Sequence, residues 1–203
     1  MTRVSKRQQE PKSCGAATLL VTLNELKGAP ATTNVEEDKI YQAVKIPSGQ
    51  LGEDETLPTS IYRYAVANGL HAEIIESSST AGTFGGKDMY KLYRHMVATE
   101  GLGAQLKSRD IADTDLDGNG HLFLVVKFTN SDLTHYILAR KDGGRTFIMN
   151  PDPGSDDEMA LPAFNARITT NSKGVLTYDG GKTVNDATHR AYDYTGIAVR
   201  VWP

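Results

Sequence analysis

The sequence predicts an α+β fold in which a helical first half packs on an antiparallel β-sheet formed by the second half. Through residue 99, apolar residues recur mainly at helical spacing, with capping residues and Gly or Pro stops between the segments. From residue 121 onward they occur in short, strand-length runs separated by glycine turns, which is typical of hairpins. Helices followed by strands is the order expected of an α+β domain.

The size and composition of the chain fit one globular domain over residues 1–203. Its 39% hydrophobic and 23% charged residues are ordinary for a globular protein, and a net charge of −3 indicates neither a nucleic-acid nor a membrane partner. The one cysteine excludes an internal disulfide. No apolar run approaches the roughly 18 residues that span a bilayer, and the N-terminus lacks the apolar segment of a secretory signal. We therefore expect a cytoplasmic protein, with signal-independent export left open.

Four helices are expected in the first half. The first has Cys14 on its opening turn, with Ser13 as a reasonable N-cap and Gly28 as the C-terminal stop. The second follows a cap at Thr33 or Asn34, runs through Glu36, Ile40, Tyr41 and Val44, and is ended by Pro47. The third and fourth are expected over residues 57–68 and 88–99. A short strand is expected over residues 70–76.

The second half offers strand-like segments at residues 121–128, 135–140, 146–149 and 194–202. The turn DGG at residues 142–144 joins the second and third of these into a hairpin, so the residues flanking its open end face each other. We expect a loop at residues 150–158, a short helix at 161–168, a second hairpin around Gly180-Gly181 and a closing strand at 194–202.

Cys14 is the first candidate for chemistry. At the N-terminus of a helix, unpaired N–H groups and the positive end of the helix dipole favour the thiolate, which is the nucleophilic form. Such a nucleophile needs a base to take its proton, a group that orients the base, and hydrogen-bond donors for the oxyanion. The alternative is that Cys14 is a small buried hydrophobic residue.

His135 is the best candidate for the base. It opens a strand at the edge of the polar loop TNSDLT, where a side chain can face a cleft. The hairpin returns the chain so that Asn150 comes within reach of His135, and an amide oxygen can accept the ring N–H. His121 is ambiguous, because it opens the preceding strand. Three further histidines lie among polar neighbours and are expected at the surface: His71, His95 and His189.

Three motifs follow one another along the chain. The first is Q-x5-C-G (Gln8, Cys14, Gly15), the second is H-Y-I at a strand start (His135), and the third is N-P-D-P-G after the returning strand (Asn150–Gly154). In this order they resemble the papain-like cysteine peptidases that process leader peptides at double-glycine sites, the C39 type. The resemblance covers residues 8–154 and leaves the C-terminal remainder unexplained.

The resemblance implies a papain-like fold with its cleft between the helical half and the sheet. It further implies that Cys14 is the nucleophile, His135 the base and Asn150 the group that orients the base. The backbone N–H of Cys14 and the side-chain amide of Gln8 would then hold the oxyanion.

The chain departs from known patterns at two points. The third triad member is Asn rather than the family's usual Asp, and the residues around the nucleophile read C-G-A-A rather than papain's own C-G-S-C-W. Two assignments also have rivals. Asp152, which also precedes a proline, is a rival of Asn150, and Gln9 is a rival of Gln8, although six residues upstream of the cysteine is the spacing that the family uses.

The expected function is hydrolysis of a peptide bond in a polypeptide substrate. A peptidase of this kind without an attached transporter can serve as a toxin or effector that a dedicated inhibitor or immunity protein restrains. The same site could instead transfer its acyl group to an amine, as an acyltransferase, or act as a deamidase. The non-enzyme alternative is a binding module with an inactive site.

No cofactor or metal is expected. The stretch Asp113–His121 (DTDLDGNGH) begins like a calcium-binding loop, but its twelfth position is Leu124 rather than the required Glu, so a solvated loop is favoured. One cysteine and scattered histidines do not supply a zinc site, and no phosphate-binding glycine motif occurs.

Overall fold

The structure is a computed structural model that describes residues 3–78, 80, 84, 86–129, 131, 133–163, 167–170, 176–178 and 191–203. Its α-helices are α1 (Cys14–Lys27), α2 (Asn34–Val44), α3 (Pro58–Ala67) and α4 (Gly86–Thr99). Its strands are β1 (His71–Glu76), β2 (Leu106–Ser108), β3 (His121–Phe128), β4 (Thr134–Asp142), β5 (Arg145–Asn150), β6 (Ser155–Glu158), β7 (Arg167–Thr170), β8 (Leu176–Tyr178) and β9 (Ala191–Trp202). Within these residues, no helix is long and apolar enough to cross a membrane.

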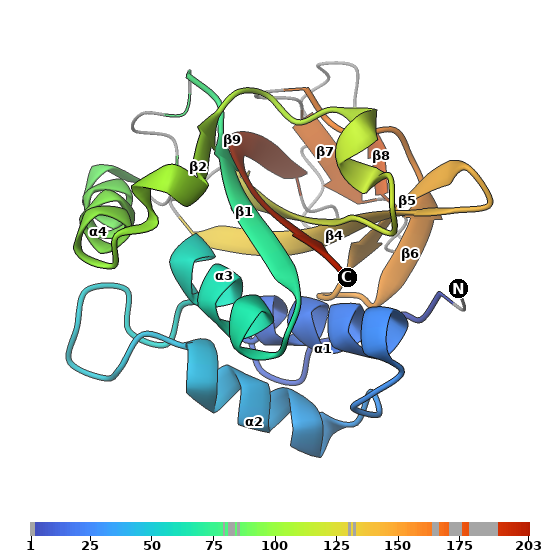
Figure 1. Cartoon of the computed structure of the whole chain (residues 1–203), viewed down its shortest axis with the longest axis horizontal. Helices are drawn as coiled ribbons and strands as arrows, with labels where there is room; N and C mark the ends of the chain where they lie inside the picture. The colour runs from blue at the N-terminus through green and yellow to red at the C-terminus, as the bar shows by residue number, and fades with distance from the viewer. Residues whose placement is uncertain are drawn as a thin grey trace.

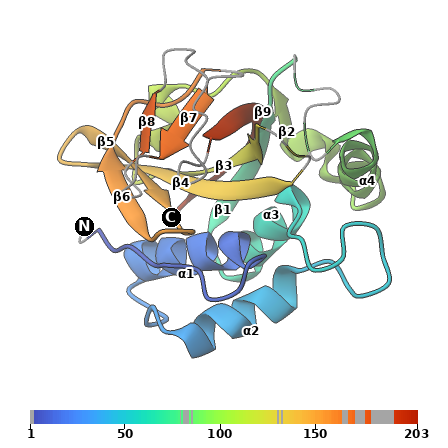
Figure 2. The ribbon, with the colours of Figure 1, turned by 180° about the vertical axis from the view of Figure 1, so that it is seen from behind.

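The strands form one sheet in the order β2-β1-β9-β3-β4-β5-β6, and β7 and β8 branch from β9. Figures 1 and 2 show α1, α2 and α3 gathered on one side of the sheet, with β7 and β8 on the other side. The predicted mixture of helices and sheet is therefore confirmed. The sheet is antiparallel except where β1 and β2 pair in parallel, a pair that the sequence analysis missed.

The sheet buries side chains on both faces. Along β4, Tyr136 and Leu138 belong to the core shared with the helices, whereas Ile137 and Ala139 belong to a second core on the opposite face. This alternation follows from the two-residue period of a strand. Because these four residues are anchored on alternate faces of the sheet, the directions of the side chains at the start of β4 are fixed as well.

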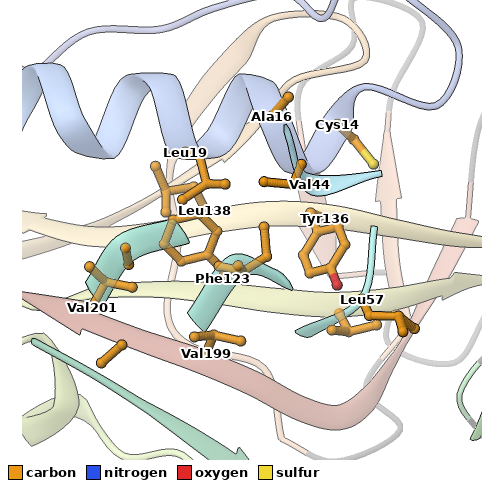
Figure 3. Packing of buried hydrophobic residues seen from close by; sticks show 14 of the residues in the cluster. Cys14, Ala16, Leu19, Val44, Leu57, Phe123, Tyr136, Leu138, Val199 and Val201 are labelled. Atoms are coloured by element: carbon orange, nitrogen blue, oxygen red, sulfur yellow. The ribbon is translucent and has the colours of Figure 1, made fainter. Parts of the chain in front are cut away.

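Helix α1 is enclosed between the sheet and α2. Every residue from Cys14 to Leu23 is buried, and Leu19 lies against Leu138 and Phe123 of the sheet (Figure 3). The helix ends at Gly28, whose φ of 72° only glycine adopts readily. The N-terminal turn of α1 is thus held by packing on all sides.

The C-terminal strand lies in the middle of the sheet. Strand β9 pairs with β1 on one side and with β3 on the other, so the predicted closing strand is a central one. The local sequence of β9 predicts a strand but not which strands pair with it, because both partners are distant in the chain. The residues that the family resemblance leaves unexplained thus complete the core.

Two local predictions were wrong. The expected loop at residues 150–158 contains β6, an acidic edge strand that pairs with β5. Asp156 of this strand forms ion pairs with Arg3 and Arg140. The expected helix at 161–168 overlaps β7, which pairs with β9 and β8. In both segments tertiary pairing outweighs weak local preference. The turn expected at Gly180-Gly181 and residue His189 lie outside the described residues.

Candidate active site

Cys14 is the first residue of α1, as predicted, and its sulfur lies beside the start of β4. Only 7% of the residue is exposed (Figure 3), and the backbone of Tyr136 and of Gly15 acts to lower the pKa of the thiol. Burial nevertheless raises the pKa of the Cys14 thiol to about 11, and the negative charge of Glu55 adds to this effect. The expectation of a favoured thiolate is therefore wrong for the resting protein, in which desolvation outweighs the helix terminus.

His135 and Asn150 are joined by a buried hydrogen bond. The distance from His135 Nε2 to Asn150 Oδ1 is 2.8 Å. The backbone N–H of Asp152 also donates to Asn150 Oδ1, at 3.1 Å, which fixes the amide orientation. An amide oxygen can only accept, so Nε2 carries a proton, and in the neutral ring Nδ1 carries the lone pair. The arrangement leaves His135 chemically suited to take a proton at Nδ1.

The register of the hairpin explains this contact. Asp142 pairs with Arg145 across the turn Gly143-Gly144, where both glycines have positive φ, and Leu138 pairs with Met149. Extending this register places Asn150 opposite the residue two positions beyond His135. The two side chains are therefore diagonal neighbours on one face of the sheet, a relationship that long side chains can bridge.

Two aromatic residues that the sequence analysis did not single out enclose His135. The ring of Tyr192 stacks on the imidazole with centroids 5.5 Å apart and planes inclined by 20°, and Phe128 lies 6.1 Å away. Asn150 Nδ2 donates to the hydroxyl of Tyr192 at 3.4 Å. Tyr192 comes from β9, so only the central position of that strand, which no local pattern indicates, brings it here.

A cavity of about 430 Å³ opens over Cys14 and His135, and both line it. Its other walls come from the N-terminal segment 7–12, residues 55–56, Phe128, residues 133–134 and Asp152. Asn150 lies fully buried behind His135. A polypeptide reaching this cavity would meet the thiol and the imidazole together.

The N-terminal segment is fastened to the loop that follows Asn150. The backbone N–H of Gln8 donates to Pro151 O at 2.7 Å. Gly154 has a φ of 78°, and a Cβ built on it would lie 3.0 Å from Arg7 Cβ. The glycine of the N-P-D-P-G motif therefore both makes the turn and admits the segment that carries Gln8.

Glu37 of α2 holds the same segment from the other side. Its side chain is buried and accepts hydrogen bonds from Ser13 Oγ at 2.6 Å and from the Gln9 backbone N–H at 2.8 Å. Lys6 Nζ lies 2.6 Å from its second oxygen. Ser13 stands at the N-cap position, but its hydroxyl serves this network rather than capping α1.

Gln8 lines the cavity, but its amide donors are used elsewhere. Nε2 donates to Glu10 O at 2.9 Å and to Pro11 O at 3.0 Å, whereas Oε1 is buried without a hydrogen-bond partner. Because two carbonyl oxygens face the NH₂ group, this amide orientation is the favourable one. Holding an oxyanion therefore requires the Gln8 side chain to turn. Gln9 also lines the cavity and is more exposed.

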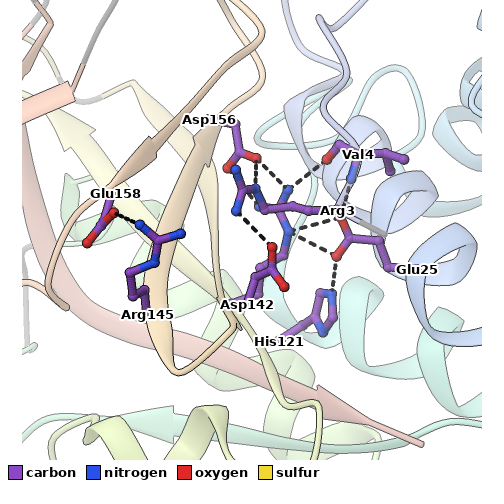
Figure 4. A network of polar contacts seen from close by, with 9 residues as sticks. Arg3, Val4, Glu25, His121, Asp142, Arg145, Asp156 and Glu158 are labelled. Atoms are coloured by element: carbon purple, nitrogen blue, oxygen red, sulfur yellow. Dashed lines mark hydrogen bonds and ion pairs between the residues drawn. The ribbon is translucent and has the colours of Figure 1, made fainter. Parts of the chain in front are cut away.

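The other described histidines lie outside the cavity. His71 and His95 are exposed, whereas His121 is buried and hydrogen-bonds to Glu25 Oε2 through Nε2 at 2.8 Å and to Asn119 O through Nδ1 at 3.1 Å. Both ring nitrogens of His121 therefore face oxygen atoms. His121 thus belongs to a buried ion network behind α1 (Figure 4).

The acidic loop before β3 is stabilised by an arginine. Asp115 binds Arg109 through both oxygens, at 2.6 and 2.8 Å, and also accepts from the backbone of Ala112. Among the residues described, no group of three or more His, Cys, Asp or Glu side chains is placed to hold a metal ion.

No protein-family profile matches this sequence, and no curated protein matches it either. The assignment of a function consequently depends on the geometry of the cavity and on the chemistry of its residues.

Proposed function

We propose that this protein is a papain-like cysteine peptidase that hydrolyses a peptide bond with Cys14, His135 and Asn150. The observation that carries the proposal is the 2.8 Å hydrogen bond from His135 Nε2 to Asn150 Oδ1, behind the cavity that Cys14 and His135 line. A satisfied core cysteine requires neither an oriented imidazole nor an open cavity beside its sulfur. The combination matches the requirements of a nucleophile, a base and an orienting group.

In the proposed reaction, His135 acts as a general base because the resting thiol is protonated at neutral pH. The thiol proton moves to His135 Nδ1 while the sulfur attacks the carbonyl carbon. The tetrahedral oxyanion is held by the backbone N–H of Cys14, and by Gln8 after its side chain turns. The C–N bond then breaks, and His135 returns its proton to the leaving amine.

Water completes the cycle. His135 takes a proton from water, the hydroxide attacks the thioester carbon, and the C–S bond breaks to release a carboxylic acid and restore the thiol. Throughout, Asn150 accepts the hydrogen bond from Nε2, so the proton transfers are assigned to Nδ1, and the stacked Tyr192 limits rotation of the ring. If an amine replaces water in this step, the same site transfers the acyl group instead.

The test is proteome-wide mapping of new N-termini after incubation with the wild-type protein or with Cys14→Ala. We expect cleavages that disappear in Cys14→Ala and in His135→Ala but persist in His95→Ala, the matched control at an exposed histidine. Persistence of the cleavages in Cys14→Ala would contradict the proposal. Mass analysis of the products distinguishes hydrolysis from acyl transfer or deamidation.

Reactivity toward iodoacetamide tests the non-enzyme alternative. Because the resting thiol is protonated at neutral pH, its reaction depends on a base, so Cys14 of the folded wild type should react faster than Cys14 of folded His135→Ala. Equal rates in the two proteins would favour a binding module with an inactive site.

A further inference from the structure

We infer that the cavity accepts a lysine or arginine side chain of the substrate against the carboxylate of Glu55. This inference rests on the proposed function, because it concerns the same cavity and the same nucleophile. It adds a substrate class, a polypeptide with a basic residue close to the bond that Cys14 attacks.

Glu55 lies where a substrate would pass. It lines the cavity together with Cys14 and His135, and its Oε2 accepts a hydrogen bond from Thr134 Oγ1 at 3.3 Å. Thr134 directly precedes His135, so the carboxylate stands at the entrance to the triad. Its charge also helps to raise the pKa of the Cys14 thiol.

The carboxylate of Glu55 lacks the cation that other buried carboxylates of this protein have. Glu25, Glu37 and Glu76 each pair with an arginine or lysine, at 2.9, 2.6 and 3.0 Å respectively. Among the residues that the structure describes, no lysine or arginine nitrogen lies within 4 Å of Glu55. The nearby Lys12 Nζ is held by the carbonyl oxygen of Glu53 at 2.9 Å.

Half-burial without a matching cation disfavours the charged form of the Glu55 carboxylate. Burial raises the pKa of Glu55, although Lys12 and the Thr134 hydroxyl oppose the shift. An ammonium or guanidinium group entering the cavity would remove this penalty and gain a charge-assisted hydrogen bond. An acidic substrate residue would instead meet a like charge.

The charged residues that line the cavity also favour a cation in its interior. Arg7 and Lys12 line it but are exposed at its rim, whereas Glu55 and Asp152 are half-buried. The interior is therefore acidic, and screening by solvent weakens the rim cations most. This distribution favours a substrate cation inside the cavity.

Charged thiol reagents test the inference without knowledge of the substrate. Methyl methanethiosulfonate (neutral), its 2-aminoethyl analogue (cationic) and its 2-sulfonatoethyl analogue (anionic) each form a disulfide with Cys14 and release methanesulfinate. We expect the ratio of cationic to anionic rate constants to fall about 3- to 10-fold in Glu55→Gln. Taking the ratio of the two rate constants cancels any change in the thiolate fraction of Cys14 that the loss of the Glu55 charge causes.

Two further variants complete the experiment. Glu53→Gln changes the net charge equally from an exposed position of the same loop, and should leave the ratio unchanged. Glu55→Asp keeps the charge, should keep most of the preference, and serves as a second variant if Glu55→Gln folds poorly. An equal ratio in the wild type, Glu55→Gln and Glu55→Asp would overturn the inference.

The neutral reagent separates this inference from the proposed function. If Cys14 reacts with the neutral reagent faster in the wild type than in His135→Ala, but without a charge preference, the inference alone is overturned. If Cys14 reacts with the neutral reagent no faster in the wild type than in His135→Ala, both are overturned.

A peptide library gives the readout on substrates. Libraries with one fixed residue at each position should show that the wild type prefers Lys or Arg over Glu at one position near the cleaved bond. Glu55→Lys should reverse this preference toward Glu or Asp. A preference for Lys or Arg that persists in Glu55→Lys would contradict the role of Glu55.

Discussion

Gly15 and Thr56 lie so close together that a side chain at residue 15 would have to displace Thr56. A Cβ built on Gly15 would lie 3.0 Å from both Cβ and Cγ2 of Thr56. The carbonyl oxygen of Thr56 in turn accepts a hydrogen bond from the Tyr136 hydroxyl at 2.9 Å. The glycine after Cys14 therefore lets the segment that carries Glu55 close against the first turn of α1, where it forms one wall of the cavity.

The first prediction concerns Gly15→Ala. Alanine favours a helix by about 1 kcal/mol over glycine, but overpacking against Thr56 costs about 1–3 kcal/mol, so we expect a net loss of stability. Urea denaturation should show a smaller loss when Thr56→Ala is already present, because two of the three close contacts are then gone. Additive effects of the two changes would contradict the packing argument.

The second prediction concerns the orienting group. Asn150→Ala removes the acceptor for His135 Nε2, and a misplaced base should lower kcat by about 100-fold with little change in KM. Asn150→Asp keeps an acceptor oxygen and should retain more activity. Asp152→Asn tests the rival residue, and we expect a small effect because Asp152 contacts Asn150 through its backbone N–H. Loss of activity in Asp152→Asn but not in Asn150→Ala would reverse the assignment.

The third prediction is a dependence of stability on pH that arises from Cys14. The unfolded thiol loses its proton near pH 9, whereas the folded one keeps it until about pH 11. The folded state therefore binds more protons between these values. The contribution of Cys14 is fully present below pH 9 and is lost as pH rises toward 11, by about 2–3 kcal/mol.

Cys14→Ser isolates this effect, because serine does not titrate in this range. Urea denaturation from pH 7 to pH 11 under reducing conditions should show the stability difference between wild type and Cys14→Ser shifting against the wild type above pH 9. A constant difference over the whole range would show that the thiol is not buried as described.

The sequence identifies residues of the site well where their relationship is local. The hairpin turn at Gly143-Gly144 determines which residues face each other, so the contact of His135 with Asn150 could be predicted from spacing alone. The helical spacing of apolar residues and the stop at Gly28 likewise locate α1, with Cys14 on its first turn, although the hydroxyl of Ser13 does not cap the helix. These relationships span a few residues, and elementary backbone geometry determines them.

Features that depend on distant pairing could not be predicted in the same way. Tyr192 stacks on His135 only because β9 inserts between β1 and β3, and no local pattern specifies the neighbours of a strand. The raised pKa of Cys14 has the same origin. A helix terminus is visible in the sequence, but the burial that outweighs it depends on how α1 packs against the sheet.

The final prediction concerns the ion network behind α1 (Figure 4). Glu25, His121 and Arg140 have only 2% of their side chains exposed, and Glu25 accepts hydrogen bonds from both other residues and from the backbone N–H of Val4. Although burial alone would raise the pKa of Glu25, the hydrogen bond from His121 and the charge of Arg140 hold it below its ordinary value. Glu25→Ala leaves Arg140 buried beside the gap.

We therefore expect Glu25→Ala to destabilise the protein by about 2–4 kcal/mol, because buried Arg140 keeps Asp156 but loses its second carboxylate partner, and His121 Nε2 loses its acceptor. The exposed pair of Arg145 and Glu158 provides the matched control, and Glu158→Ala should cost less than about 1 kcal/mol in the same urea denaturation. Arg140 Nη2 also donates to Val4 O at 2.7 Å, so loss of Glu25 should loosen the segment that leads to Gln8. Faster proteolysis of the N-terminal segment in Glu25→Ala than in Glu158→Ala would follow. Equal stability of the two variants would mean that the network does not anchor the N-terminal segment, which forms one wall of the cavity.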